Sequence, residues 1–434
     1  MHDCDILKLL LKYYICVTII SWATILNAQT TQAPASQAPA EIQGNQIRFD
    51  WKDSESPLLS NVQNYIEGFT PVLTWQGEQW SNLSGGKKAG TSFDYLLTFG
   101  FTQDISALSE TSNLGEIGAT FFNYAATKDF DHEYLGDITL PSNIFSSDMF
   151  RVYEIFYALS LDIDCGKIST RIGQLAADED FMGLDCSDIF LNSNFGAIPA
   201  CAGIAPHNGA TAFSQYSLAT LGMTLSFDND DFDAKIGIYN GNCGNDTSTN
   251  HGFGYPLQYV ALWYQIGAKY KVFDKNGIVR FGGNYNSGKF AYVDLSDKTE
   301  RNFYSFYLEA QQDIVTQDDG APKLAAFCRF AISPDEKIAD FSGYFDAGIN
   351  WFAPINTRRD DIFALGISMG KTTHAFADVN ANQHYDTVLE ATYRLMITPA
   401  IELQPSFQIY FDAHSETGES NAAYLIGTRL TVNF

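Results

Sequence analysis

The sequence is poor in charge, and above all in positive charge. Charged residues make up 18% of the 434 residues, against about 25% in an average soluble protein. There are 26 lysines and arginines against 51 aspartates and glutamates, which gives a formal net charge of −25. Because nucleic-acid binding depends on neutralising phosphates with lysine and arginine, nucleic acid is not an expected partner.

Long apolar runs are also missing beyond the first residues. A membrane-spanning helix needs about 20 consecutive apolar residues, and the one run that approaches this length covers residues 13–26. It follows two lysines and ends at a small-residue site that closes with Ala28. The pattern predicts a signal peptide over residues 1–28, cleaved after Ala28, with a retained membrane anchor as the alternative.

Cysteine and histidine are few and do not form metal-binding spacings. There are seven of each, without a CxxC pair and with the histidines scattered singly, so neither a metal site nor a cofactor is expected. An exported protein can form disulfides. Cys186 and Cys201, which share one long connection, are the best candidate pair, and two unpaired thiols are the alternative.

In place of long apolar runs, the sequence has alternation. From 424 to 434 apolar side chains occupy one parity and mostly polar ones the other, and the segment 401–412 repeats this pattern. A strict period of two indicates β-strands with one apolar and one polar face. These strands are about ten residues long, which exceeds the usual 5–6 residues of soluble sheets and suits a tilted bilayer crossing.

About sixteen such strands are expected, and an even count is typical of bacterial outer-membrane barrels. They are placed at 64–75, 90–104, 114–124, 149–161, 166–174, 215–227, 232–240, 257–272, 276–287, 301–313, 321–332, 340–352, 360–371, 385–398, 400–412 and 421–434. The connections are mostly longer and shorter by turns, as expected for external loops and periplasmic turns, with 333–339 and 105–113 as exceptions. The predicted fold is therefore all-β: a transmembrane antiparallel β-barrel over residues 61–434. Residues 29–60 are expected to be a disordered leader and pre-barrel segment, since 29–44 are rich in Gln, Ala and Pro.

The longest connection runs from 175 to 214 and carries several large apolar residues. Connections beyond about 15 residues without secondary structure are usually functional or disordered, and this apolar content favours packing. The available place is the barrel lumen, which is otherwise wide enough for an aqueous channel. We expect this third loop to fold inward and narrow the lumen, with an external cap as the alternative.

Several motifs resemble one known family, the carbohydrate-selective porins of bacterial outer membranes (OprB type). The most specific are RIGQLAADEDF at 171–181 and FLNSNFG at 190–196, and segments 82–90 and 285–290 add to the likeness. The resemblance covers roughly residues 60 to 434. It implies a sixteen-stranded pore with a third loop folded inward and passive uptake of sugars.

Inward parity and the third loop define the candidate site. Arginine forks can donate to paired sugar hydroxyls, carboxylates can accept from them, and aromatic faces can carry a pyranose ring. The predicted constriction and sugar-binding residues are Glu154, Arg171, Gln174, Asp178, Glu179, Asp180, Asn192, Phe195, Trp263, Arg280, Arg394 and Arg429. For each charge, the alternative is that it only neutralises another across a wet pore. A site worth about −4 kcal/mol binds in the millimolar range, so we expect weak saturable binding without catalysis or energy coupling.

Two other functions remain open. A non-specific or cation-preferring porin would suit the net charge and the acidic run 178–180. A secreted β-rich glycosidase could use a carboxylate pair such as Asp178 and Asp180, although two acids in a loop are a weak signal among 51. The expected partners are transported carbohydrates, membrane lipids and, through terminal Phe434, the barrel-assembly machinery. A homo-oligomer is left open.

Overall fold

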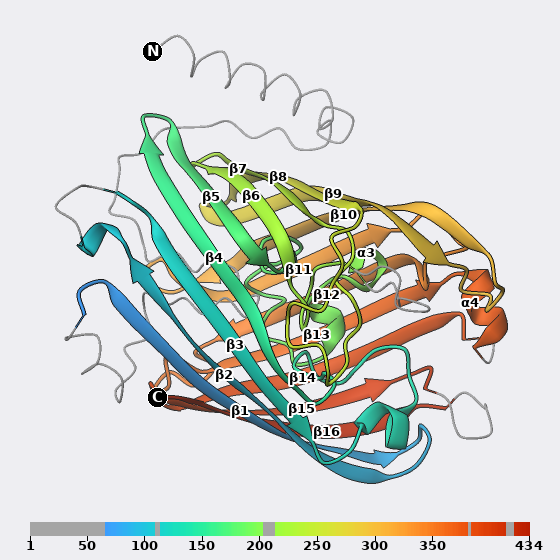
Figure 1. Cartoon of the computed structure of the whole chain (residues 1–434). Coiled ribbons are helices and arrows are strands. Elements are labelled where there is room, and N and C mark those ends of the chain that lie inside the picture. The colour runs from blue at the N-terminus through green and yellow to red at the C-terminus, as the bar shows by residue number, and fades with distance from the viewer. Residues whose placement is uncertain (1–65, 109–112, 203–212, 381–382, 414–420) are drawn as a thin grey trace.

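Sixteen antiparallel strands form one closed barrel in the computed structural model, which describes residues 66–108, 113–202, 213–380, 383–413 and 421–434. Each strand pairs with its neighbours in the chain, and β1 pairs with β16 to close the wall (Figure 1). This confirms the expected fold class. The predicted signal peptide (1–28) and leader (29–60) lie outside the described residues.

The strands are long enough to cross a bilayer at a tilt. Their bounds are β1 Phe69–Ser84, β2 Gly90–Asp104, β3 Glu116–Ala126, β4 Met149–Ile163, β5 Gly166–Leu175, β6 Thr220–Asp228, β7 Phe232–Asn240, β8 Val260–Val272, β9 Lys275–Ala291, β10 Thr299–Thr316, β11 Pro322–Ile332, β12 Phe341–Phe352, β13 Ile362–Thr372, β14 Tyr385–Thr398, β15 Ile401–Tyr410 and β16 Ala423–Asn433. The described helices are short: α3 Pro199–Ala202, α4 His374–Val379, a π-helical turn Asp131–Leu135 and 3₁₀ turns Ser106–Leu108 and Ser193–Phe195. Within the described residues, no helix has the length and apolar content to cross a membrane.

The first strand differs most from its expected position. It was expected at 64–75 with a loop after it, but β1 continues to Ser84. In the second half of β1 the side chains do not follow the usual order of apolar residues outside and polar residues inside. The bulky Trp80 points inward beside Glu78, while polar Gln79 points outward. Arg429 of β16 forms an ion pair with Glu78, and this gives the inward carboxylate a partner that periodicity does not reveal.

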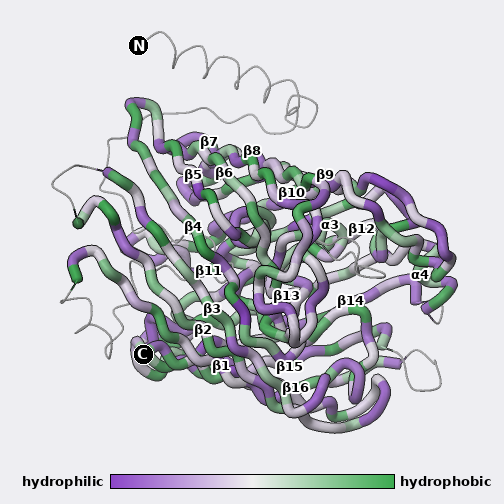
Figure 2. The backbone as a smooth tube through the Cα atoms, viewed as in Figure 1, coloured by the Kyte–Doolittle hydropathy of each residue, from purple (hydrophilic) through white to green (hydrophobic). Residues whose placement is uncertain are grey.

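Apolar side chains cover the outside of the barrel, and polar ones fill much of the inside. In β6, for example, Leu221, Met223 and Leu225 are exposed, whereas Thr220 and Thr224 are buried. Figure 2 shows the same alternation of hydrophobic and hydrophilic residues along the strands. Because the outward residues are those of a lipid-facing surface, the chain is apolar outside and polar inside, the reverse of a soluble protein.

The connections at one end of the barrel include the three longest, which we call L2 (127–148), L3 (176–219) and L4 (241–259). The connections at the opposite end are shorter, among them 164–165, 229–231, 273–274 and 399–400. We call these the loop end and the turn end. L3 begins close to its predicted start but ends five residues later than expected, because β6 begins at Thr220.

L3 lies against inward-pointing side chains of β9 to β15. Arg329 of β11 donates to the backbone carbonyls of Met182 (2.9 Å) and Gly196 (2.8 Å). Gln404 of β15 donates to the carbonyl of Ile189 at 2.7 Å. Buried carbonyls need such partners, so the polar inner wall holds the backbone of a loop whose described residues form no strand.

The two cysteines of L3 do not form the predicted disulfide. Cys186 and Cys201 are separate, buried free thiols. The carbonyl of Cys186 accepts from Asn350 of β12 (3.0 Å), and the carbonyl of Cys201 accepts from Asn284 of β9 (2.8 Å). The pairing was wrong because their shared loop is fixed to different strands at the two positions, and the two side chains pack into different apolar clusters.

Candidate functional site: the lumenal cavity

A cavity of about 610 Å³ lies between L3 and the part of the wall formed by β1, β14, β15 and β16. L2 contributes residues from Ile138 to Phe145, and L3 contributes most of the stretch from Ser187 to Pro199. The charged residues that line the cavity are Asp178, Glu179, Asp188, Asp340, Glu402, Arg394 and Arg429. The described lining thus carries five acids and two arginines.

Arg429 is the more fixed of the two arginines. Its side chain is 8% exposed and forms an ion pair through Nε with Glu78. Its Nη2 donates to Asn143 Oδ1 (2.6 Å) and lies 3.2 Å from Ser142 Oγ. Arg429 therefore ties L2 to the wall and has little donor capacity left for a solute.

Arg394 is the freer arginine. Its side chain is 26% exposed, and its Nε lies 3.8 Å from Glu402 Oε2, whose side chain is 19% exposed. No hydrogen bond joins the Arg394 guanidinium to another described residue. An offset, partly exposed pair of this kind presents donors and acceptors to the cavity at the same place.

The acids on the L3 side are held by hydrogen bonds from neutral groups. Asp178 accepts from the backbone N–H of Tyr216 at 2.9 Å, and Glu179 accepts from the Tyr153 hydroxyl at 3.2 Å. Burial raises the pKa of Asp178 to about 7, since its effect, together with nearby carboxylates such as Glu154, exceeds that of the Tyr216 N–H, which lowers the pKa. The charge of this side of the cavity therefore changes near neutral pH.

Three predicted site residues form an ion cluster where L3 leaves the wall. Arg171 Nη2 lies 2.7 Å from Glu154 Oε2, and its Nη1 lies 3.2 Å from Asp180 Oδ2. The other oxygen of Glu154 accepts from the backbone N–H of Ala176 at 2.9 Å. The cluster fixes the first residues of L3, and none of its three charged members lines the cavity.

Other predicted residues also hold L3 in place. Asn192 donates to Gln408 Oε1 (3.0 Å) and to the Tyr410 hydroxyl (2.6 Å). Arg280 donates to Asp233 Oδ2 (3.0 Å) and to the backbone carbonyl of L3 residue Gly183 (3.1 Å).

Trp263 and Gln174 are the two remaining predicted residues outside the cavity, and they too contact L3 or the adjoining wall. Trp263 is 1% exposed and stacks on Phe181 of L3, with ring centroids 5.8 Å apart. Gln174 donates to the backbone carbonyls of Val152 and Tyr153 in β4. Both side chains point inward, as parity requires, but they lie under the loops.

Of the twelve predicted residues, the structure therefore brings five to the cavity: Asp178, Glu179, Phe195, Arg394 and Arg429. Their role in sugar binding stays a prediction. The other seven are Glu154, Arg171, Gln174, Asp180, Asn192, Trp263 and Arg280, and they support L3 or the adjoining wall. Parity alone could not separate these groups, because it identifies inward residues without showing which of them L3 covers.

Some lining residues were missed by the sequence analysis. Thr431 and Asn433 of β16 share the parity of Arg429 within the predicted strand 421–434, so parity already placed them on the polar face, although they were not chosen as site residues. Asp188 lies in the loop already chosen for the constriction. Ser142 and Asn143 of L2 carry no such signal, because nothing in their sequence indicates that this loop also folds inward.

Comparisons with known proteins agree with this architecture. The sequence model described as "Carbohydrate-selective porin, OprB family" matches residues 94–434. The "High pH structure of Pseudomonas putida OprB" aligns with a TM-score of 0.74 and 16% sequence identity, covering 89% of this chain and 97% of that chain. The "Low pH structure of Pseudomonas putida OprB" aligns with a TM-score of 0.52 and 13% identity, covering 88% and 98%. No curated protein matches the chain.

Proposed function

The chain belongs to the OprB family of carbohydrate-selective porins, and we propose that its sugars pass through the cavity between L3 and the wall of β14, β15, β16 and β1. It is an outer-membrane porin that passes carbohydrates through a β-barrel. The place where the sugar binds and its affinity follow from the lining of the cavity.

The observation that carries this proposal is the offset pair of Arg394 and Glu402. A sugar hydroxyl both donates and accepts, so it can bridge the partly exposed guanidinium of Arg394 and the partly exposed carboxylate of Glu402, which no direct hydrogen bond joins. Phe145 lines the same cavity, is half-buried and offers apolar ring surface to the face of a pyranose, whereas Phe195 lines the cavity from a fully buried position. A passing sugar would exchange part of its hydration for these contacts.

The binding must be weak for the channel to work. Each hydrogen bond that replaces one to water contributes only about 0.5–1.5 kcal/mol. A few such contacts reach about −4 kcal/mol, which corresponds to millimolar affinity. Conduction needs a site that is favourable enough to enter and weak enough to leave. Transport is therefore passive, and the proposal includes no chemical step.

The glycosidase alternative receives no support from the placement of its carboxylates. Asp178 lines the cavity, whereas Asp180 pairs with Arg171 outside the cavity lining. A glycosidase needs both carboxylates on opposite sides of one glycosidic bond. The family and the fold are those of transport channels.

A cation preference is a second candidate property, favoured by the charges of the lining. Five acids and two arginines face the cavity, and Arg429 is already paired with Glu78. A lumen of one predominant sign attracts counter-ions and disfavours ions of the same sign. Neutral and amino sugars should therefore pass more readily than sugar acids.

The test is ion current through the purified full-length protein in planar bilayers, with neutral sugars added to one side. We expect saturable current reduction at millimolar sugar, together with a reversal potential that favours potassium over chloride in a salt gradient. Strong cation selectivity without current reduction by any sugar would contradict the binding proposal and favour a general porin.

The remaining expected partners are part of the same proposal. Lipids would cover the exposed apolar residues of the outer wall, and the barrel-assembly machinery would recognise the last strand and Phe434.

A further inference from the structure

The loop end of β4 carries an arginine outside the cavity lining that is fully buried. Arg151 Nε donates to the carbonyl of Asn250 at 2.8 Å. Its Nη1 donates to the carbonyl (3.0 Å) and the hydroxyl oxygen (2.8 Å) of Ser217. Its Nη2 donates to Asp246 Oδ1 (2.9 Å) and to the carbonyl of Thr247 (3.1 Å). All five N–H groups of the guanidinium are therefore used.

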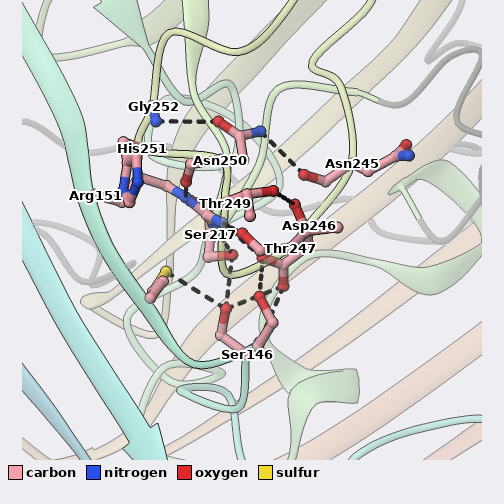
Figure 3. Close-up of polar contacts among 12 residues, drawn as sticks. Ser146, Arg151, Ser217, Asn245, Asp246, Thr247, Thr249, Asn250, His251 and Gly252 are labelled. Carbon is pink, nitrogen blue, oxygen red and sulfur yellow. Dashed lines mark hydrogen bonds and ion pairs between the residues drawn. The ribbon is translucent and has the colours of Figure 1, made fainter.

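These partners come from the end of L3 and from L4, and the end of L2 joins them (Figure 3). The hydroxyl oxygen of Ser146 lies 2.9 Å from Ser217 Oγ and 3.0 Å from Asp246 Oδ2. Ser147 donates its hydroxyl to Asp246 Oδ1 at 2.8 Å. Three loops that are separate in sequence thus meet at one guanidinium and one carboxylate.

L4 also covers an open strand edge beside Arg151. The pairing of β4 with β5 begins at Ile155, so residues 149–154 of β4 have no partner in β5. His251 of L4 takes that place: its carbonyl accepts from the N–H of Val152 (3.1 Å), and its ring Nδ1 lies 2.8 Å from the carbonyl oxygen of Phe150. An unpaired edge is a weak point of a sheet, and here a loop held by Arg151 protects it.

The cluster lies directly behind the cavity wall. Tyr216 precedes Ser217, Phe145 precedes Ser146, and both aromatic residues line the cavity. The Tyr216 hydroxyl donates to the carbonyl of Ile144 in L2 at 2.6 Å. Loss of the cluster would therefore remove the support beside two aromatic side chains that line the cavity.

We propose that Arg151 is a positioning residue for transport: by joining L2, L3 and L4 it fixes Tyr216 and Phe145, and thereby sets the width and steadiness of the pore. This inference rests on the proposed function, because it assigns the tuning of the same cavity. Lysine cannot replace this arginine, since it has three donors on one atom and no planar fork.

The experiment compares the wild-type chain with Arg151→Gln, Arg151→Lys and Asp246→Asn in planar bilayers. Arg358→Gln is the matched control, because Arg358 also forms an ion pair with an aspartate, Asp361, but lies in a connection at the turn end. We expect Arg151→Gln to keep the β-sheet content of the barrel, to increase open-channel current noise and to shift the half-saturating sugar concentration by about threefold or more. Arg151→Lys should show current noise and a half-saturating sugar concentration between those of Arg151→Gln and the wild type.

A well-folded Arg151→Gln protein with the current noise and sugar half-saturation of wild type and Arg358→Gln would overturn the proposal. If Arg151→Gln does not fold, Asp246→Asn decides, since it removes one charge and keeps the side-chain shape; unchanged noise in that variant would also overturn the proposal. Open-channel noise needs no sugar, so failure of the proposed function, seen as wild-type current that no sugar reduces, is distinguishable from failure of this inference.

Discussion

The inner wall of the barrel has two regions that differ in what they do with similar charges. Under L3, Arg329 and Asp346 pair at 2.5 Å between Nη2 and Oδ2, and both side chains are fully buried. Beside the cavity, the closest atoms of Arg394 and Glu402 are 3.8 Å apart and both side chains are partly exposed. In both regions inward parity supplies the charges, while the path of L3 decides whether they become an anchor or a surface for solute.

The largest expected effect comes from breaking the covered region. Arg329→Met leaves Asp346 buried without its cation and removes the bonds to the carbonyls of Met182 and Gly196. Breaking a buried pair in this way costs about 3–5 kcal/mol of unfolding free energy. We expect lower stability in denaturant titrations in detergent, together with larger and more variable conductance as L3 detaches.

Two variants sharpen this test. The double variant Arg329→Met with Asp346→Leu should recover part of the lost stability, because no unpaired buried charge remains. Arg394→Met, in the open region, should have little effect on stability. Equal stability of Arg329→Met and Arg394→Met would show that the covered and open regions do not differ as described.

A smaller effect is expected from the open region, and on transport instead of stability. Arg394→Gln keeps a polar side chain but removes the charged donor beside Glu402. Loss of about 1 kcal/mol of binding corresponds to a roughly fivefold higher half-saturating sugar concentration. Sugar-dependent current reduction measures this directly. The proposed role of Arg394 fails if the half-saturating concentration is unchanged while a neutral sugar still reduces the current.

The smallest effect should appear as a shift of ion selectivity with pH. Because the pKa of Asp178 is raised to about 7, lowering the pH from about 8 to about 6 adds a proton and removes one negative charge from the cavity. The potassium-over-chloride preference should fall slightly. Lower pH should reduce the ion selectivity but increase the free energy of unfolding. A carboxyl whose pKa is raised in the folded state binds its proton more tightly there than in the unfolded chain, so the protein becomes more stable as the pH falls through about 7.

Asp178→Asn is the control for the pH dependence. This variant should resemble the wild type at low pH and lose the change in reversal potential over this range. A selectivity that changes with pH equally in Asp178→Asn would assign the titration to another group.

The fold could be predicted from the sequence to a large extent, and the solute path only in part. Alternation with strands of about ten residues identified the barrel, because a bilayer demands both properties at once. β1 was placed too early because Trp80 and Gln79 reverse the usual faces of the strand. Among the twelve predicted site residues, Arg394 reached the cavity and Arg280 did not, since that distinction depends on where L3 lies.

The Arg151 cluster lies beyond sequence reasoning for a similar reason. The guanidinium binds residues 217 and 246, and residue 146 bonds both of these; the three are far apart in the chain and lie in loops without periodic pattern. No local rule relates them. Strand periodicity constrains the wall, whereas the long loops at one end are placed by contacts between residues far apart in the chain.

Closure of the wall joins two strands from opposite ends of the barrel sequence. Thr74 of β1 donates its hydroxyl to Asn433 of β16 across 359 positions of sequence, and the pairing of these strands seals the cylinder. Closing a contact of such high sequence separation carries a large entropic cost. Until the two strands pair, β1 and β16 each present an open edge to which another chain could add a strand. Closure therefore also protects the protein against edge-to-edge aggregation.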